Sequence, residues 1–119
     1  MNYINEINSF YVWLETNPIP VSSIALWHAL MAICNKTGWK QEFNCANKII
    51  ELRTGLSVSA IHRARNTLKQ SGLIDFHVRQ GQQSTIYKVI PFAVQNDKQT
   101  DQVTDQVTDQ VTDQVTSIS

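Results

Sequence analysis

The sequence lacks the residues on which several classes of protein depend. Its only two cysteines, Cys34 and Cys45, form no Cys-x-x-Cys pair and have no histidine at the spacing of a zinc site. We therefore expect two buried, reduced thiols rather than a disulfide or a metal site. The sequence also has no cluster of acids and bases and no glycine-rich loop of the kind that cradles phosphate. It predicts neither an enzyme nor a protein with a cofactor.

Long apolar runs are missing as well. The longest apolar stretch, around residues 24–34, is interrupted by His28 and is too short to span a bilayer. The first residues do not form a cationic start followed by an apolar segment, because Asn2, Asn5 and Glu6 interrupt them. These absences predict a soluble cytoplasmic protein without a membrane partner.

A formal net charge of zero conceals two segments of opposite charge. Residues 1–96 carry nine lysines and arginines against five acids, which gives +4. Residues 97–119 carry one lysine against five aspartates, which gives −4. All nine basic residues of the first segment lie between Lys36 and Lys88. A basic middle beside an acidic tail is typical of proteins that bind nucleic acids.

Apolar residues at helical spacing predict a helix over residues 3–16, which ends at Asn17-Pro18 because a residue before proline disfavours helical backbone. Glu6 and the other polar residues lie off its apolar stripe. The stripe consists of Ile4, Ile7, Phe10, Tyr11 and Leu14. A second helix is expected from Pro20 to residues 35–38. The three tryptophans fall on apolar stripes and are expected to anchor the core; they are Trp13, Trp27 and Trp39.

The next segment predicts a short strand and a third helix. Apolar and polar residues alternate over residues 39–44, as in a half-buried strand. Asn44 is expected to cap the helix that follows it. The side chains expected to be buried in that helix are Ile49, Ile50 and Leu52.

Residues 54–88 are the most informative part of the chain. Gly55 turns the backbone, Ser57 caps a helix over residues 57–71, and Gly72 ends that helix as a left-handed cap. Two β-prone runs, residues 73–79 and 85–90, are joined by a polar loop that contains a glycine, as in a hairpin. Turn, basic helix and hairpin in this order are typical of a winged helix-turn-helix. We therefore predict a mainly α fold with a small β-hairpin wing.

The phase of the helix over residues 57–71 separates an inward stripe from an outward face. The stripe consists of Val58, Ile61, Ala64 or Arg65, and Leu68. The outward face would lie in the DNA major groove, where arginine pairs with guanine and asparagine with adenine. The residues predicted to read bases are Ser59, His62, Arg63 and Asn66. The residues predicted to contact the DNA backbone are Lys48, Ser57, Arg65, Thr67, Lys69, Arg79, Gln82 and Lys88.

Simpler interpretations stand beside these assignments. For any single basic residue, a solvated position on the helix face is the commoner case. Ser57 is more readily a helix cap than a reactive group, and Tyr87 fits core packing as well as a DNA contact. His28 and His77 have no partner that would suggest catalysis.

The end of the chain consists of Thr-Asp-Gln-Val repeated four times, at residues 100–115. One valine per repeat provides too little apolar surface for a core. We therefore divide the chain into a DNA-binding domain over residues 1–94 and a disordered repeat tail over residues 95–119. A frayed helix is the alternative for the tail, although threonine and valine are poor helix formers.

Together these motifs resemble the N-terminal winged-helix domain of phage replisome-organiser proteins, the DnaD-like replication initiators of Gram-positive phages. The resemblance covers roughly residues 22–92, and it is carried by residues 29–39, 52–57 and 63–75 and by Tyr87-Lys88. It implies that the domain binds double-stranded origin DNA in a bacterial host cell. It also implies that a C-terminal part recruits helicase-loading proteins. In this chain the repeats stand where that part would follow, so helicase loading is not expected of it.

The resemblance also suggests a use for the repeats, because several phage initiators have their origin inside their own gene. Four identical tetrapeptides would follow naturally from a tandem twelve-base repeat in the gene, and that repeat would then be the DNA site. A neutral linker expanded by replication slippage explains the repeats equally well. Two rival functions remain for the domain: a winged-helix transcriptional regulator that forms a homodimer through its first helix, and a module that binds another replisome protein.

Overall fold

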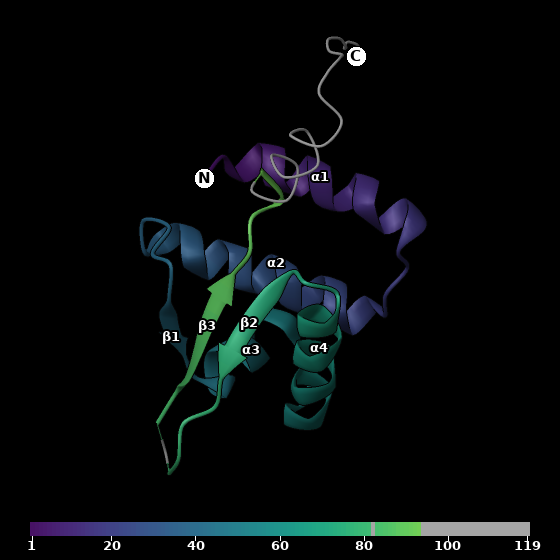
Figure 1. The fold of residues 1–119 in the computed structure, drawn as a ribbon. Coiled ribbons are helices and arrows are strands. Elements are labelled where there is room, and N and C mark those ends of the chain that lie inside the picture. The colour runs from purple at the N-terminus through teal and green to yellow at the C-terminus, as the bar shows by residue number, and fades with distance from the viewer. Residues whose placement is uncertain (82, 94–119) are drawn as a thin grey trace, which may run out of the picture.

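The computed structural model describes residues 1–81 and 83–93 of the chain (Figure 1). The elements follow one another as α1 (Tyr3–Thr16), α2 (Val21–Lys36), β1 (Phe43–Cys45), α3 (Asn47–Thr54), α4 (Val58–Gln70), β2 (Ile74–His77) and β3 (Thr85–Val89). The strands form one antiparallel sheet in the order β1-β3-β2. A mainly helical fold with a small hairpin is thus confirmed. The boundary predicted at residue 94 and the repeat tail lie outside the described residues.

Helix α2 is the central element of the fold. Figure 1 shows α1 along one side of it, with the sheet, α3 and α4 on the other side. Trp27 on α2 is 1% exposed, and its ring stacks on that of Phe10 from α1 with 3.9 Å between the ring centroids. Trp13 and Trp39 are partly buried against the same core, which confirms the tryptophans as core anchors. The two cysteines are also buried, as free thiols.

Glu6 of α1 is buried, which corrects its expected place among the exposed polar residues. Its side chain is 3% exposed, whereas Ile4 and Tyr11 of the expected apolar stripe are 70% and 51% exposed. The backbone N–H groups of Phe92 and Ala93 donate to the two Glu6 carboxylate oxygens at 2.7 and 3.1 Å. The chain that follows β3 returns to α1 with two N–H groups outside the sheet, and the carboxylate satisfies them.

The segment between α2 and α3 departs most from its prediction. Trp39 has a φ of 65°, in the left-handed region, so the extended run begins only at Phe43. Asn44 is a residue of β1 and does not cap α3, which begins after Ala46 without a side-chain cap. Two of the three apolar side chains expected to be buried in α3 are exposed: Ile49 at 43% and Leu52 at 72%. Helix α3 is short, so it buries only Ile50 completely.

The boundaries of α4 are those that its sequence predicts. Gly55 has a φ of 76°, and the Ser57 hydroxyl accepts a hydrogen bond from the backbone N–H of Ala60 at 3.2 Å. At the other end, Gly72 has a φ of 78° and the N–H of Leu73 donates to the carbonyl of Leu68 at 3.0 Å, as in a Schellman cap. The one error lies in the first turn, where Val58 is 41% exposed.

The hairpin of β2 and β3 is confirmed, and β1 adds a third strand to it. Phe76 of β2 and Phe43 of β1 lie on either side of Tyr87 in the central strand, on the inner face of the sheet. Asp75 of β2 lies opposite Lys88 of β3 in the register of the two strands, and both side chains are exposed on the outer face. The inner face packs on the helical core, which fixes the direction in which the hairpin extends.

Candidate nucleic-acid interface

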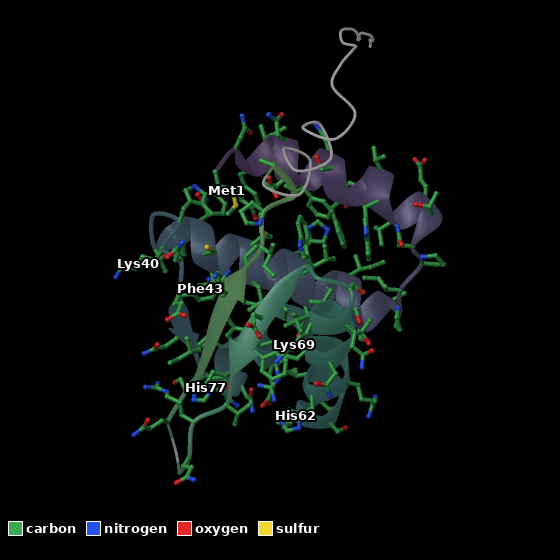
Figure 2. All side chains as sticks on the ribbon, in the orientation of Figure 1. Met1, Lys40, Phe43, His62, Lys69 and His77 are labelled. Atoms are coloured by element: carbon green, nitrogen blue, oxygen red, sulfur yellow. The ribbon has the colours of Figure 1, made fainter. Side chains whose placement is uncertain are left out.

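The exposed face of α4 carries all four residues predicted to read bases. Ser59, His62, Arg63 and Asn66 are exposed, while Ile61, Ala64 and Leu68 are buried on the opposite side of the helix. Among the described residues, the side chains of His62, Arg63 and Asn66 have no hydrogen-bond partner. Their donors and acceptors are therefore open to a ligand. Figure 2 shows His62 on α4 and His77 at the end of β2 at the same end of the molecule, away from α1.

A three-residue turn joins α3 to α4 and sets the angle between them. The Thr54 hydroxyl donates to the carbonyl of Ile50 at 2.7 Å and accepts from the N–H of Leu56 at 3.1 Å. Gly55 supplies the left-handed residue between these two contacts. Ser57 comes next, with its hydroxyl engaged as the cap of α4. A short turn with glycine between two helices is the usual form of a helix-turn-helix.

Arg65 is buried, which corrects its assignment as a DNA backbone contact. It is 5% exposed, and its guanidinium donates to the Thr85 hydroxyl at 3.2 Å and to the Tyr87 hydroxyl at 3.3 Å. The guanidinium also lies over the ring of Phe76, 4.9 Å from its centroid. A phosphate cannot reach a side chain enclosed in this way. Arg65 instead fixes α4 against both strands of the hairpin, and burial raises the pKa of the Tyr87 hydroxyl that it contacts.

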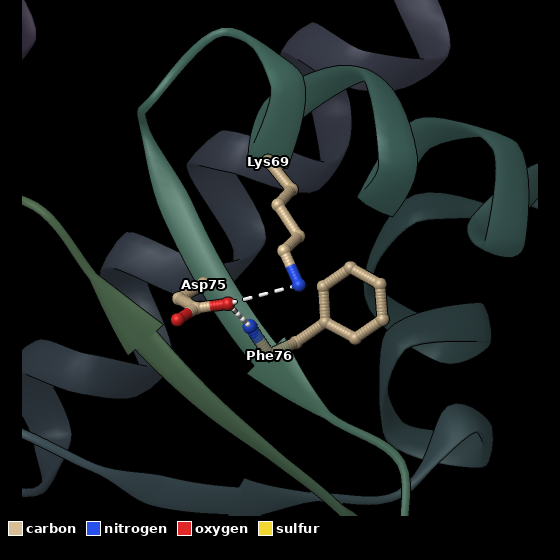
Figure 3. A network of polar contacts seen from close by, with 3 residues as sticks. All are labelled: Lys69, Asp75 and Phe76. Carbon is tan, nitrogen blue, oxygen red and sulfur yellow. Dashed lines mark hydrogen bonds and ion pairs between the residues drawn. The ribbon is translucent and has the colours of Figure 1, made fainter.

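Lys69 is exposed at the end of α4, and a carboxylate already lies beside it (Figure 3). Its Nζ is 3.3 Å from an Asp75 carboxylate oxygen and 5.1 Å from the centroid of the Phe76 ring. The same carboxylate oxygen accepts from the backbone N–H of Phe76 at 2.8 Å. This N–H and then the Lys69 ammonium lower the pKa of Asp75. A phosphate at Lys69 would compete with Asp75 for the ammonium.

The other residues predicted to contact the DNA backbone lie in different parts of the fold. Lys48 is exposed in the first turn of α3, and the Thr67 hydroxyl donates to the carbonyl of Arg63 within α4. Arg79 is partly buried, and its Nε donates to the carbonyl of Ser84 at 2.7 Å, which closes the base of the hairpin loop. Gln82 lies outside the described residues.

Lys88 is not brought together with the exposed face of α4. It lies on the outer face of the sheet, near the end of β3 that points toward α1, whereas the hairpin tip points the other way (Figure 1). There it lines a hollow with Lys40 and Met1. The structure thus places this predicted backbone contact away from the exposed face of α4.

The charge around α4 has one sign over a long stretch. Residues 52–74 contain Arg53, Arg63, Arg65 and Lys69 and no aspartate or glutamate. Arg53 is exposed in the last turn of α3, directly before the turn into α4, and no role was predicted for it from the sequence. Its place before the glycine turn is the signal that could have identified it.

Two other kinds of feature are absent from the described residues. Among residues 1–81 and 83–93, no three histidine, cysteine, aspartate or glutamate side chains are grouped so that they could hold a metal ion. In the same part of the chain, no helix combines the length and the apolar character needed to cross a membrane.

No protein-family model matches the chain, and no curated protein matches its sequence. The resemblance to phage replisome organisers therefore rests on the motifs alone. The function of the chain must be inferred from its residues and their arrangement.

Proposed function

We propose that this chain is a winged helix-turn-helix module that binds double-stranded DNA. Helix α4 would lie in the major groove, α3 would cross the DNA backbone, and the β2–β3 hairpin would act as the wing. The order α3, glycine turn, α4 and hairpin supports this architecture. The observation that carries the proposal is the exposed face of α4, which presents Arg63 and Asn66 with no internal hydrogen-bond partner, in a stretch without acids.

The geometry supports different roles for the individual residues. Arg63 can donate two hydrogen bonds to a guanine, and Asn66 can pair with an adenine one turn further along the same face. Lys48 and Arg53 on α3 provide charge for phosphates, which gives affinity without sequence information. Arg65 contributes indirectly, because it holds the hairpin at a fixed position relative to α4.

The test begins with a selection on random duplexes to find the preferred site, followed by binding measurements at two salt concentrations. Arg63→Ala should weaken binding to that site by about 1–3 kcal/mol, roughly 5- to 150-fold, and relax discrimination at one base pair. Lys48→Ala should weaken binding to all DNA sequences alike. It should also reduce, by about one, the slope of the logarithm of the binding constant against the logarithm of the salt concentration. Lys36→Ala, an exposed lysine at the end of α2, is the matched control. If both test variants bind like this control, α4 is not the reading helix.

The motif resemblance leads us to assign this module to a phage-type replication initiator that recognises origin repeats. The DNA encoding the Thr-Asp-Gln-Val repeats provides the test. Matching codons in all four repeats, and a gel shift with that duplex but not with a scrambled one, would support an origin inside the gene. Synonymous codons that differ between the repeats would contradict an origin inside the gene, but they would not contradict DNA binding by α4.

One observation favours a second candidate, a winged-helix transcriptional regulator that dimerises through α1. Ile4 and Val12 are 70% and 66% exposed on α1, and Tyr11 is 51% exposed. Apolar side chains grouped on one exposed helix are typical of an interface with a partner. Sedimentation over a range of protein concentrations tests this second candidate. A dimer that is dissociated by Ile4→Glu would support the regulator. A monomer at all concentrations would contradict it.

A further inference from the structure

A hollow lies at the end of the molecule remote from the exposed face of α4. Its volume is about 580 Å³, and it is bounded by the N-terminus, the loop after α2 and the chain that follows β3. Most of its lining is apolar, and its only charged side chains are two lysines. The apolar lining consists of Met1, Trp39, Val89, Ile90, Pro91 and Ala93. Figure 2 shows Met1 and Lys40 on this side of the molecule and His62 on the other.

The two lysines give the hollow a positive charge. Lys40 and Lys88 are both exposed at its edge, and no aspartate or glutamate lines it. Neither lysine forms an ion pair with another described residue. A ligand that fits must therefore combine an apolar group for the floor with a carboxylate for the edge.

The chain itself contains such a ligand, later in the sequence than the last residue that lines the hollow. Ala93 lines the hollow, and the first Thr-Asp-Gln-Val repeat begins seven residues later, at Thr100. Seven residues span at most roughly 25 Å, so the first repeats are within reach of the lysines. Each repeat places one carboxylate two residues before one valine, and the segment that carries the repeats has a net charge of −4.

We propose that the hollow binds a Thr-Asp-Gln-Val repeat of the same chain. The valine packs against the apolar floor beside Trp39, and the aspartate lies between Lys40 and Lys88. A short tether raises the effective concentration of a repeat at the hollow to about the millimolar range. Even a contact with a millimolar Kd is then occupied about half of the time, and four identical repeats compete to fill it.

This inference does not depend on DNA binding, because the hollow and the exposed face of α4 lie at different ends of the molecule. It gives the repeats a role at the protein level, whatever DNA sequence encodes them. It also accounts for the opposite charges of the two segments as a complementary pair.

The test uses the full chain and follows the NMR signal of the Trp39 indole N–H, assigned with Trp39→Phe. Changing the four repeat valines (Val103, Val107, Val111 and Val115) to serine should shift this signal. The matched control changes the four repeat glutamines to asparagine and should leave the signal in place. Adding a peptide of two repeats to the serine variant should return the signal toward its original position. Lys40→Glu, made in the serine variant, should lower the affinity for that peptide at least threefold.

Three results would overturn the proposal. The first is a Trp39 signal that the valine-to-serine change moves no further than the glutamine control. The second is an effect that vanishes on dilution, since the repeats would then bind a neighbouring chain. The third is DNA binding that tightens in the serine variant, since the repeats would then cover α4.

Discussion

The buried carboxylate of Glu6 permits a quantitative prediction about how α1 is held in place. It accepts two backbone N–H groups, from Phe92 and Ala93, and the first of these residues is itself buried. A hydrogen bond to a charged group contributes about 1.5–3 kcal/mol. Glu6→Gln keeps one acceptor but sets an amide NH₂ against the other N–H, so we expect a loss of about 2 kcal/mol in the free energy of unfolding. Glu6→Ala removes both bonds and should cost about 3–4 kcal/mol.

Thermal and urea unfolding of the full chain measure these losses. For a domain of this size, 1 kcal/mol lowers Tm by roughly 4–8 °C, so Glu6→Gln should lower it by about 8–16 °C. Glu15→Gln on the same helix is the control, because Glu15 is exposed and a change at such a site stays within about 0.5 kcal/mol. The reasoning would be refuted if Glu6→Gln and Glu6→Ala had the same Tm and the same urea midpoint as this control.

Three further predictions concern single groups elsewhere in the fold. Lys69→Gln should raise the pKa of Asp75 only part of the way to its ordinary value, because the Phe76 N–H bond remains; NMR titration of the carboxyl group measures this. Whatever stability this carboxylate adds is lost as the pH falls through its lowered pKa. Gly55→Ala should cost about 1–2 kcal/mol in urea unfolding and Gly55→Asn less, because asparagine tolerates a φ of 76° better. Burial raises the pKa of Cys34 and Cys45, so both thiols should react with iodoacetamide far more slowly in the native protein than after unfolding; equal rates would contradict this.

The features that the sequence predicts correctly are those determined within a few residues. The glycine turn at Gly55, the Ser57 cap and the Gly72 stop each depend on contacts between near neighbours, so residue type alone identifies them. The exposed face of α4 follows from helical periodicity, which places Arg63 and Asn66 opposite Ile61 and Leu68 without further information.

The errors concern side chains whose partners lie far away in the chain. Glu6 is buried because N–H groups 86 and 87 residues later need an acceptor. Arg65 is buried because two hydroxyl groups 20 and 22 residues later accept from it, and a basic residue on a helix gives no sign of such partners. A charge count therefore overestimates the positive surface of α4 by one residue.

The two ends of the described chain meet at one place, since Met1 and Ala93 line the same hollow. Anything joined before Met1 or after Ala93 therefore starts from the side of the domain that faces away from α4. A fusion partner at either end can be added without standing between α4 and its ligand. The same proximity makes the domain suited to circular permutation, with a short peptide joining the old ends and new ends opened in an exposed loop.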